Sequence, residues 1–414
     1  MRFLSFLIIA LFFFGSVKAQ FSAAKPEDVG MSTDRLKRVD QMINDHIQQK
    51  WFPGAVALII RNGKIVHFKA YGINDTDSNS PMKTDGIFRI ASQTKAITSV
   101  AIMMLMEEGK ILLNDPVSRY IPEFKNPQVL KSFNEKDTTY TSEPAKSEIT
   151  IRQLLSHTSG IDYAGIGSKE MRAIYAKNKI PSGIGTPEGL LGEQIKALAK
   201  LPLKHHPSEN YTYGLSTDVL GYVVEVVSGM SLNDFFSTRI FEPLDMKDTY
   251  FYLPKEKQNR LVAVYEEKNG VASKMRMDKN RNPDYPNISG TYYSGGAGLS
   301  STIEDYAKFL SMLLNGGAYN GKKLLSRKTI EMMLINHTGD LTTQFGLGFG
   351  LETVKNDTNS IMSLGSYTWG GIFATNYWVD PKEKLIGLVY TQIWPTTHSI
   401  SERFKVLTYQ AIID

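Results

Sequence analysis

Apolar residues recur at helical spacing in many stretches of the chain. In residues 32–49 they follow a Ser/Thr/Asp start, which is typical of a helix N-terminus. A second helix is predicted from about Ser92 to Gly109, where glycine favours a C-cap. The same spacing predicts helices at 150–156, 186–200, 216–229, 231–240 and 399–412, and one after the glycine-rich stretch that begins at Ser294.

Strand patterns gather towards the two ends of the chain. Residues 54–72 form two apolar runs around Asn62-Gly63, a pair that favours a hairpin turn. Residues 372–379 and 385–393 also read as strands, joined at Asp380-Pro381. From 110 to about 290 strand patterns are hard to find. We therefore expect one α/β unit, formed by residues 20–112 and 291–414, interrupted by a mostly helical domain at 113–290.

The N-terminal segment predicts a secretory signal. Arg2 is followed by a mostly apolar run from Phe3 to Phe14 and then by small residues up to Ala19. The run is too short to span a bilayer, and its end suits signal peptidase, so we expect cleavage after Ala19 and no membrane span in the secreted or periplasmic product. The chain has no cysteine, which excludes disulfides, thiolate metal sites and lipid attachment through cysteine.

Charge and motifs narrow the class of partner. Removal of residues 1–19 takes away Arg2 and Lys18 and lowers the formal charge from +5 to +3, too little to predict nucleic-acid binding. No His-Glu-x-x-His or similar spacing predicts a metal site, and nothing predicts a cofactor. The sequence also lacks the Gly-x-Ser-x-Gly motif of the α/β-hydrolases, which argues against a catalytic triad of that type. The partner we expect is a small molecule, while the oligomeric state stays open.

The candidate chemistry begins with Ser92 and Lys95. Positions three apart share one face of a helix, so Lys95 would lie over Ser92 at the helix N-terminus. There the serine could serve as a cap, or it could be a nucleophile whose proton the lysine helps to remove. A second Ser-x-x-Lys, Ser80 to Lys83, lies in a polar loop whose Pro81 fits a turn, and we favour the first copy.

With further motifs in order, the chain resembles the serine β-lactamase-like hydrolases, which include class C β-lactamases, DD-peptidases and family VIII carboxylesterases. The resemblance implies an α/β (α+β) fold, in which an antiparallel sheet is flanked by helices and a helical domain is inserted. The resemblance extends over nearly the whole chain after residue 19. It rests on Ser92-x-x-Lys95 and on ITIRQLLSHTSGI (149–161), NYTYGLSTDVLGYVVEVVSG (210–229), SGGAGLSSTIEDYAKFL (294–310), FGLGFG (345–350) and TWGGIFATNYWVDP (368–381).

The family's second motif, often Tyr-x-Asn, falls on Tyr213. Its third position is Leu215 rather than asparagine, a departure that resembles the esterase branch. The resemblance implies that Tyr213 and Lys95 move protons and that Leu215 borders the substrate. Two other tyrosines compete for this role, namely Tyr211 and the literal match Tyr285-Pro286-Asn287.

The family's third motif is usually Lys-Thr-Gly on a strand. Here Trp369-Gly370-Gly371 precedes the predicted strand at 372–379 and resembles the esterase version, whereas His337-Thr338-Gly339 matches by letter but follows a helix end and precedes a loop. The resemblance implies that Trp369, Gly370 and Gly371 line the substrate site. It also implies that the backbone N–H groups of Ser92 and Ile372 form the oxyanion hole.

These residues predict acyl transfer through an acyl-enzyme on Ser92. Trp369 cannot pair with the carboxylate of a β-lactam or peptide as the usual cation does, so carboxylic esters are the expected substrates. The alternatives are a β-lactamase or D-amino-acid carboxypeptidase/amidase, and a catalytically silent protein that binds a cell-wall ligand on the same fold.

Overall fold

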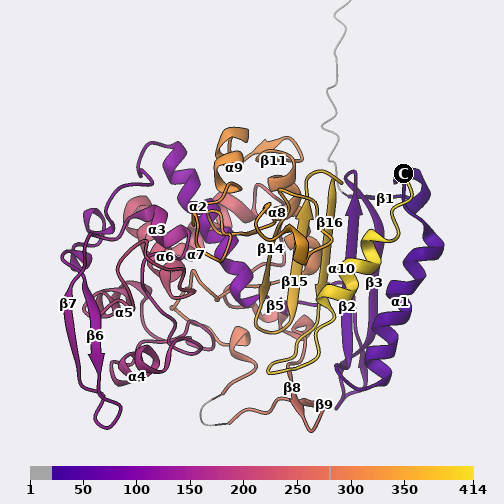
Figure 1. Cartoon of the computed structure of the whole chain (residues 1–414). Coiled ribbons are helices and arrows are strands. Elements are labelled where there is room, and N and C mark those ends of the chain that lie inside the picture. The colour runs from indigo at the N-terminus through magenta and orange to yellow at the C-terminus, as the bar shows by residue number, and fades with distance from the viewer. Residues whose placement is uncertain (1–20, 279–280) are drawn as a thin grey trace, which may run out of the picture.

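The computed structural model describes residues 21–278 and 281–414, and the predicted signal at 1–19 lies outside the described residues. An eight-stranded sheet and its helices occupy one part of the molecule, and a group of shorter helices occupies the other (Figure 1). The strand order is β1-β3-β2-β16-β15-β14-β13, with β4 paired to β3. Every pair is antiparallel except β1–β3. The strands are β1 Ser22–Ala23, β2 Gly54–Arg61, β3 Lys64–Asp75, β4 Ser80–Pro81, β13 Gly350–Leu351, β14 Tyr367–Gly371, β15 Thr375–Asp380 and β16 Leu385–Tyr390.

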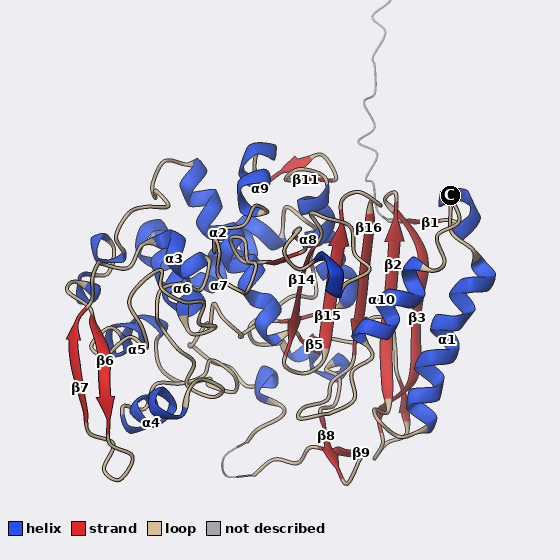
Figure 2. Cartoon of the chain, viewed as in Figure 1, coloured by secondary structure: helices blue, strands red, loops and turns tan. Residues whose placement is uncertain are grey.

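The centre of the sheet is buried on both faces, and β2 shows why. Its residues alternate between two cores: Val56, Leu58 and Ile60 join the larger one, and Ala55, Ala57 and Ile59 the smaller. The smaller core lies under α1 (Thr33–Gln48) and α10 (Ser401–Tyr409), which Figure 2 shows on one face of the sheet. The opposite face is covered by α8 (Ile303–Leu314). The hairpin predicted at Asn62-Gly63 is present, with both residues at positive φ.

The helical part consists of α3 Ile151–Leu155, α4 Lys169–Lys177, α5 Leu191–Leu198, α6 Ser216–Ser228 and α7 Leu232–Phe236, followed by a π-helical turn at Ser237–Phe241. It packs on α2 (Thr94–Glu107), which is buried along nearly all its length. Three of the predicted helices there are shorter than expected, and α4 was not predicted. The boundaries at 112/113 and 290/291 stay predictions.

Strands also occur between residues 110 and 290, where strand patterns are hard to find in the sequence. β6 (Gln128–Phe133) and β7 (Tyr140–Pro144) form a hairpin that projects from the helical part, and β8 (Tyr265–Lys268) pairs with β9 (Val271–Lys274). Most of their side chains are exposed or half-buried, so no alternation of apolar and polar residues reveals them. Two-residue strands complete the set as β5 (Phe88–Arg89) with β10 (Ser300–Ser301), and β11 (Ala318–Tyr319) with β12 (Lys322–Lys323). The remaining α-helix, α9, spans Arg327–Met333 and precedes β13 in the chain.

Candidate active site

Ser92 lies in a tight turn between β5 and α2. Residues Ala91–Gln93 form one turn of 3-10 helix, and α2 begins only at Thr94, two residues later than predicted. No side chain caps the start of either helix, so Ser92 is not used as a cap. Ala91, directly before it, has φ +43, a conformation that side-chain-bearing residues adopt only when the surrounding structure holds them. The serine is thus held in a strained turn with its hydroxyl available.

Lys95 lies beside that hydroxyl and is almost fully buried. Its Nζ stands 3.4 Å from Ser92 Oγ and donates a 2.7 Å hydrogen bond to the carbonyl of Gly296. The ammonium also faces the ring of Tyr213, 4.6 Å from its centre, and that of Tyr163 at 5.2 Å. The structure therefore brings together the predicted Ser92, Lys95 and Tyr213.

Tyr213 is packed among other rings. It contacts Trp369 (centres 5.4 Å apart), Tyr163 (5.6 Å) and His157 (4.9 Å). Burial and the nearby Tyr213 and Asp218 raise the pKa of Tyr163 well above its ordinary value. A tyrosine that stays protonated suits a wall of the site, so Tyr163 supports Tyr213 by packing. Sequence reasoning missed Tyr163, which lies in a loop.

A buried carboxyl group, also missed, lies close to Lys95. Asp218 on α6 is 1% exposed and accepts a 2.6 Å hydrogen bond at Oδ1 from Ser294, while its Oδ2 has no hydrogen-bond partner. A Cβ added to Gly296 would stand 2.3 Å from Asp218 Oδ2 and 3.5 Å from Lys95 Nζ, which places this oxygen and this nitrogen within about 6 Å of each other. Burial raises the pKa of Asp218, and Ser294 and Lys95 oppose that shift.

Trp369, Gly370 and Gly371 form the end of β14 rather than the entry to a strand at 372–379. β14 pairs with β15, and residues 372–374 turn between them with Ala374 at φ +59. The prediction that a strand begins at 372 was wrong. Turns are recognised in a sequence by Gly, Pro or Asn, and the turn at 372–374 contains none of them because Ala374 takes the positive-φ position. A Cβ on Gly371 would lie 2.4 Å from Ile90 O, so glycine lets Ile372 approach the Ser92 turn.

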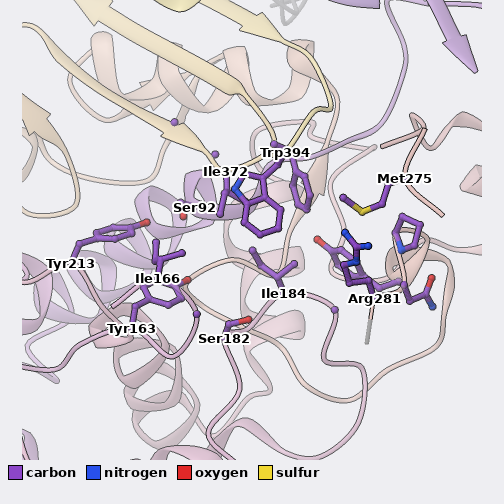
Figure 3. A pocket seen from close by; sticks show the side chains of 18 of the residues that line it. Ser92, Tyr163, Ile166, Ser182, Ile184, Tyr213, Met275, Arg281, Ile372 and Trp394 are labelled. Atoms are coloured by element: carbon purple, nitrogen blue, oxygen red, sulfur yellow. The ribbon is translucent and has the colours of Figure 1, made fainter. Parts of the chain in front are cut away.

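Ser92 opens into a cavity of about 600 Å³, within the range that encloses a small organic molecule. Figure 3 shows Ser92 and Ile372 near its middle, Tyr213 on one side, and Ile184, Trp394, Met275 and Arg281 on the other. The predicted residues that line it are Ser92, Tyr213, Trp369, Gly370, Gly371 and Ile372.

Leu215 was predicted to border the substrate, and the structure corrects this. It is 2% exposed, stands at the N-cap position of α6 without a side-chain capping bond, packs in the larger hydrophobic core, and does not line the cavity. The reason is its chemistry: an apolar side chain at that position gains by packing inwards, whereas an amide would need polar partners.

The competing motif copies fall in different places. Ser80 and Lys83 lie together in a smaller surface pocket, separate from that of Ser92. His337 is held in its loop by Arg152 and the carbonyl of Met332, and it does not line the cavity. Tyr285 does line it, although its buried hydroxyl has no hydrogen-bond partner and burial raises its pKa to about 12.

The part of the chain that the structure describes has neither a cluster of metal ligands nor a single membrane-spanning helix. Over 21–278 and 281–414, no three His, Cys, Asp or Glu side chains are grouped so as to hold a metal ion. Across the same ranges no single helix is long and apolar enough to cross a membrane. The pair Ser216–Ser228 and Leu232–Phe241, bent by 83°, meets those criteria only when joined.

Comparison with known proteins agrees with this fold. A family model described as Beta-lactamase matches residues 39–410. Protein Rv1367c of Mycobacterium tuberculosis is 33% identical over 83% of the chain and 86% of its own length, and Esterase EstB of Burkholderia gladioli is 29% identical over 87% and 91%. The solved structure of EstCE1, a hydrolase with promiscuous acyltransferase activity, superposes with a TM-score of 0.77 at 25% identity, covering 92% of this chain and 98% of that one. The predicted fold class is confirmed.

Proposed function

Because the chain belongs to the Beta-lactamase family, we propose that it is a secreted carboxylesterase that works through an acyl-enzyme on Ser92. It is a β-lactamase-fold serine hydrolase. The observation that carries the choice of esters is Trp369, which lies against Tyr213 on the cavity wall. Of the cavity-lining residues that the structure describes, only Arg281 is cationic, and it donates to Glu266 and Asp278.

The proposed reaction has two half-steps. Ser92 Oγ attacks the ester carbonyl while its one proton passes by way of Lys95, which gives up a proton as it gains one, to Tyr213 as the general base, and the oxyanion is held by the N–H groups of Ser92 and Ile372. Collapse breaks the bond to the alcohol, which leaves with a proton delivered through Tyr213. Water then attacks the acyl-Ser92 ester, the same groups take its proton, and the carboxylic acid departs with Ser92 restored.

A β-lactam should be a poor substrate for such a site. Its carboxylate lies next to the reacting amide, and an indole offers it no charge and a single N–H. Loss of a charge-assisted hydrogen bond costs roughly 1.5–3 kcal/mol, or about ten- to more than a hundredfold in kcat/KM. The esterase named among the relatives supports the same preference.

The test compares p-nitrophenyl butyrate with a penicillin and a chromogenic cephalosporin. We expect faster turnover of the ester, and a relative gain on the cephalosporin in Trp369→Lys. Penicillin hydrolysis faster than ester hydrolysis by the unmodified protein would favour the β-lactamase alternative. Failure to turn over any of the three, with no acylation of Ser92, would favour the ligand-binding alternative.

Secretion is the second part of the proposal. It is supported by Arg2, the apolar run from Phe3 to Phe14 and the small residues that end at Ala19. N-terminal sequencing of the exported protein should begin at Gln20. A product that starts at Met1 and stays with the cells would contradict it.

A further inference from the structure

The cavity extends mainly to one side of Ser92. The side chains of Ile184, Met275, Phe373 and Trp394 line this part, which we name the acyl arm. Met275 and Phe373 are buried together with Ala91 and Val264, and Ile184 packs against this cluster. Because Ala91 directly precedes Ser92, the apolar cluster lies immediately next to the reactive turn.

The opposite side of Ser92 has a different character. Tyr213, Tyr163 and Ile166 stand there, and the ammonium of Lys95 faces both tyrosine rings (Figure 3). The groups that can exchange protons therefore lie on one side of the serine, and the acyl arm lies on the other.

The stereochemistry of acyl transfer fixes the directions in which the carbonyl oxygen, the alcohol and the acid chain of an ester point in such a site. The carbonyl oxygen must point at the N–H groups of Ser92 and Ile372. The alcohol oxygen must point towards the group that protonates it, because proton transfer requires hydrogen-bond reach, and here that group is Tyr213. The carbon chain of the acid is the third substituent, and the direction left for it leads away from Tyr213.

We infer that the acyl arm binds the acid portion of the substrate, and that the substrate class is esters of uncharged, medium-chain apolar carboxylic acids; this rests on the proposed esterase function. Ile184, Met275 and Phe373 offer an apolar acid chain the burial that removes it from water. Arg281 at the far end already donates to Glu266 (3.1 Å) and Asp278 (3.0 Å), so the arm does not call for a second carboxylate on the acid.

Two ester series separate the acid from the alcohol. In p-nitrophenyl acetate, butyrate, hexanoate and octanoate only the acid grows, and each added methylene that is buried is worth up to about fourfold in kcat/KM. We expect kcat/KM to rise through octanoate. In ethyl, butyl and octyl acetate only the alcohol grows, and we expect little change. Preference for long alcohols would assign the arm to the alcohol and overturn the inference.

A matched pair of variants locates the effect. Ile184→Ser changes the acyl arm, and Ile166→Ser makes the same change to a residue that is 54% exposed on the Tyr213 side of the same cavity. We expect the octanoate-to-acetate ratio of kcat/KM to fall about tenfold or more in Ile184→Ser and to stay unchanged in Ile166→Ser. An equal fall in both variants, or a fall only in Ile166→Ser, would overturn the inference.

The outcome also distinguishes this inference from the proposed function. Turnover of acetate and butyrate with no gain at octanoate would leave the esterase function standing and refute the acyl arm. Absence of turnover on every ester in both series would refute the two together.

Discussion

Acidification should lower the free energy of unfolding of the protein, in part through His157. The substitution His157→Asn should remove the part of this decrease that is due to the imidazole. The imidazole is fully buried, its Nδ1 has no hydrogen-bond partner, and its ring packs on Tyr213, Tyr211 and Phe345. Burial, and then the positive charge of Lys95, lower the pKa of His157 from 6.5 to about 3. Asparagine is chosen because His157 has φ +56, which asparagine tolerates.

The size of the effect follows from the two pKa values. Between pH 6.5 and about 3 the unfolded chain binds a proton that the folded protein does not, so stability falls as the pH is lowered through this window. At pH 5 the unfolded imidazole is almost fully protonated, and its contribution lowers the free energy of unfolding by about 2 kcal/mol relative to pH 8.

Urea unfolding followed by tryptophan fluorescence at pH 8 and pH 5 measures this difference. The loss between the two pH values should be about 2 kcal/mol smaller in His157→Asn than in the unmodified protein. Tyr211→Phe is the control, because it alters the adjacent ring and keeps the imidazole. Equal losses in the unmodified protein and in His157→Asn would refute the reasoning.

Two further predictions concern the reacting groups. Tyr213→Phe keeps the ring contacts and removes the hydroxyl, so ester hydrolysis should fall about 10²–10⁴-fold with the fold retained by circular dichroism, while Tyr211→Phe should be mild; the reverse order would contradict the assignment. Gly296→Ala places a Cβ 2.3 Å from Asp218 Oδ2, which must displace the carboxyl beside Lys95 and should cost about 10²-fold in kcat/KM. Gly165→Ala is its control, since the new Cβ, at the wall of the cavity that Ser92 lines, would meet only Ser182 at 3.6 Å, and equal activity of these two variants would count against a role for the packing at Gly296.

The elements that sequence predicted best are those with a strong local signal. Ser32 precedes α1 and accepts a hydrogen bond from the N–H of Arg35, and Gly229 ends α6 at φ +71, as their residue types indicate. Ser92, Lys95 and Tyr213 could be named because ordered motifs fix their identity. The turn at 372–374 could not, because Ala374 adopts its conformation through contacts made elsewhere in the fold.

Residues whose role depends on burial could not be predicted from the sequence. Asp218 reads as a polar residue in the first turn of a helix, and only the packing of α6 against α2 and Gly296 makes it a buried neighbour of Lys95. The acyl arm likewise joins Ile184, Met275 and Trp394 from three distant segments. No local pattern relates such residues, because their proximity is a product of tertiary structure.

The central claim is that Ser92 forms the acyl-enzyme, and mass spectrometry of the protein treated with a fluorophosphonate probe tests it most directly. The account predicts one adduct, on the proteolytic peptide that contains Ser92, lost in Ser92→Ala together with ester hydrolysis and retained in Ser80→Ala. An adduct on Ser80, or ester hydrolysis that survives in Ser92→Ala, would contradict it.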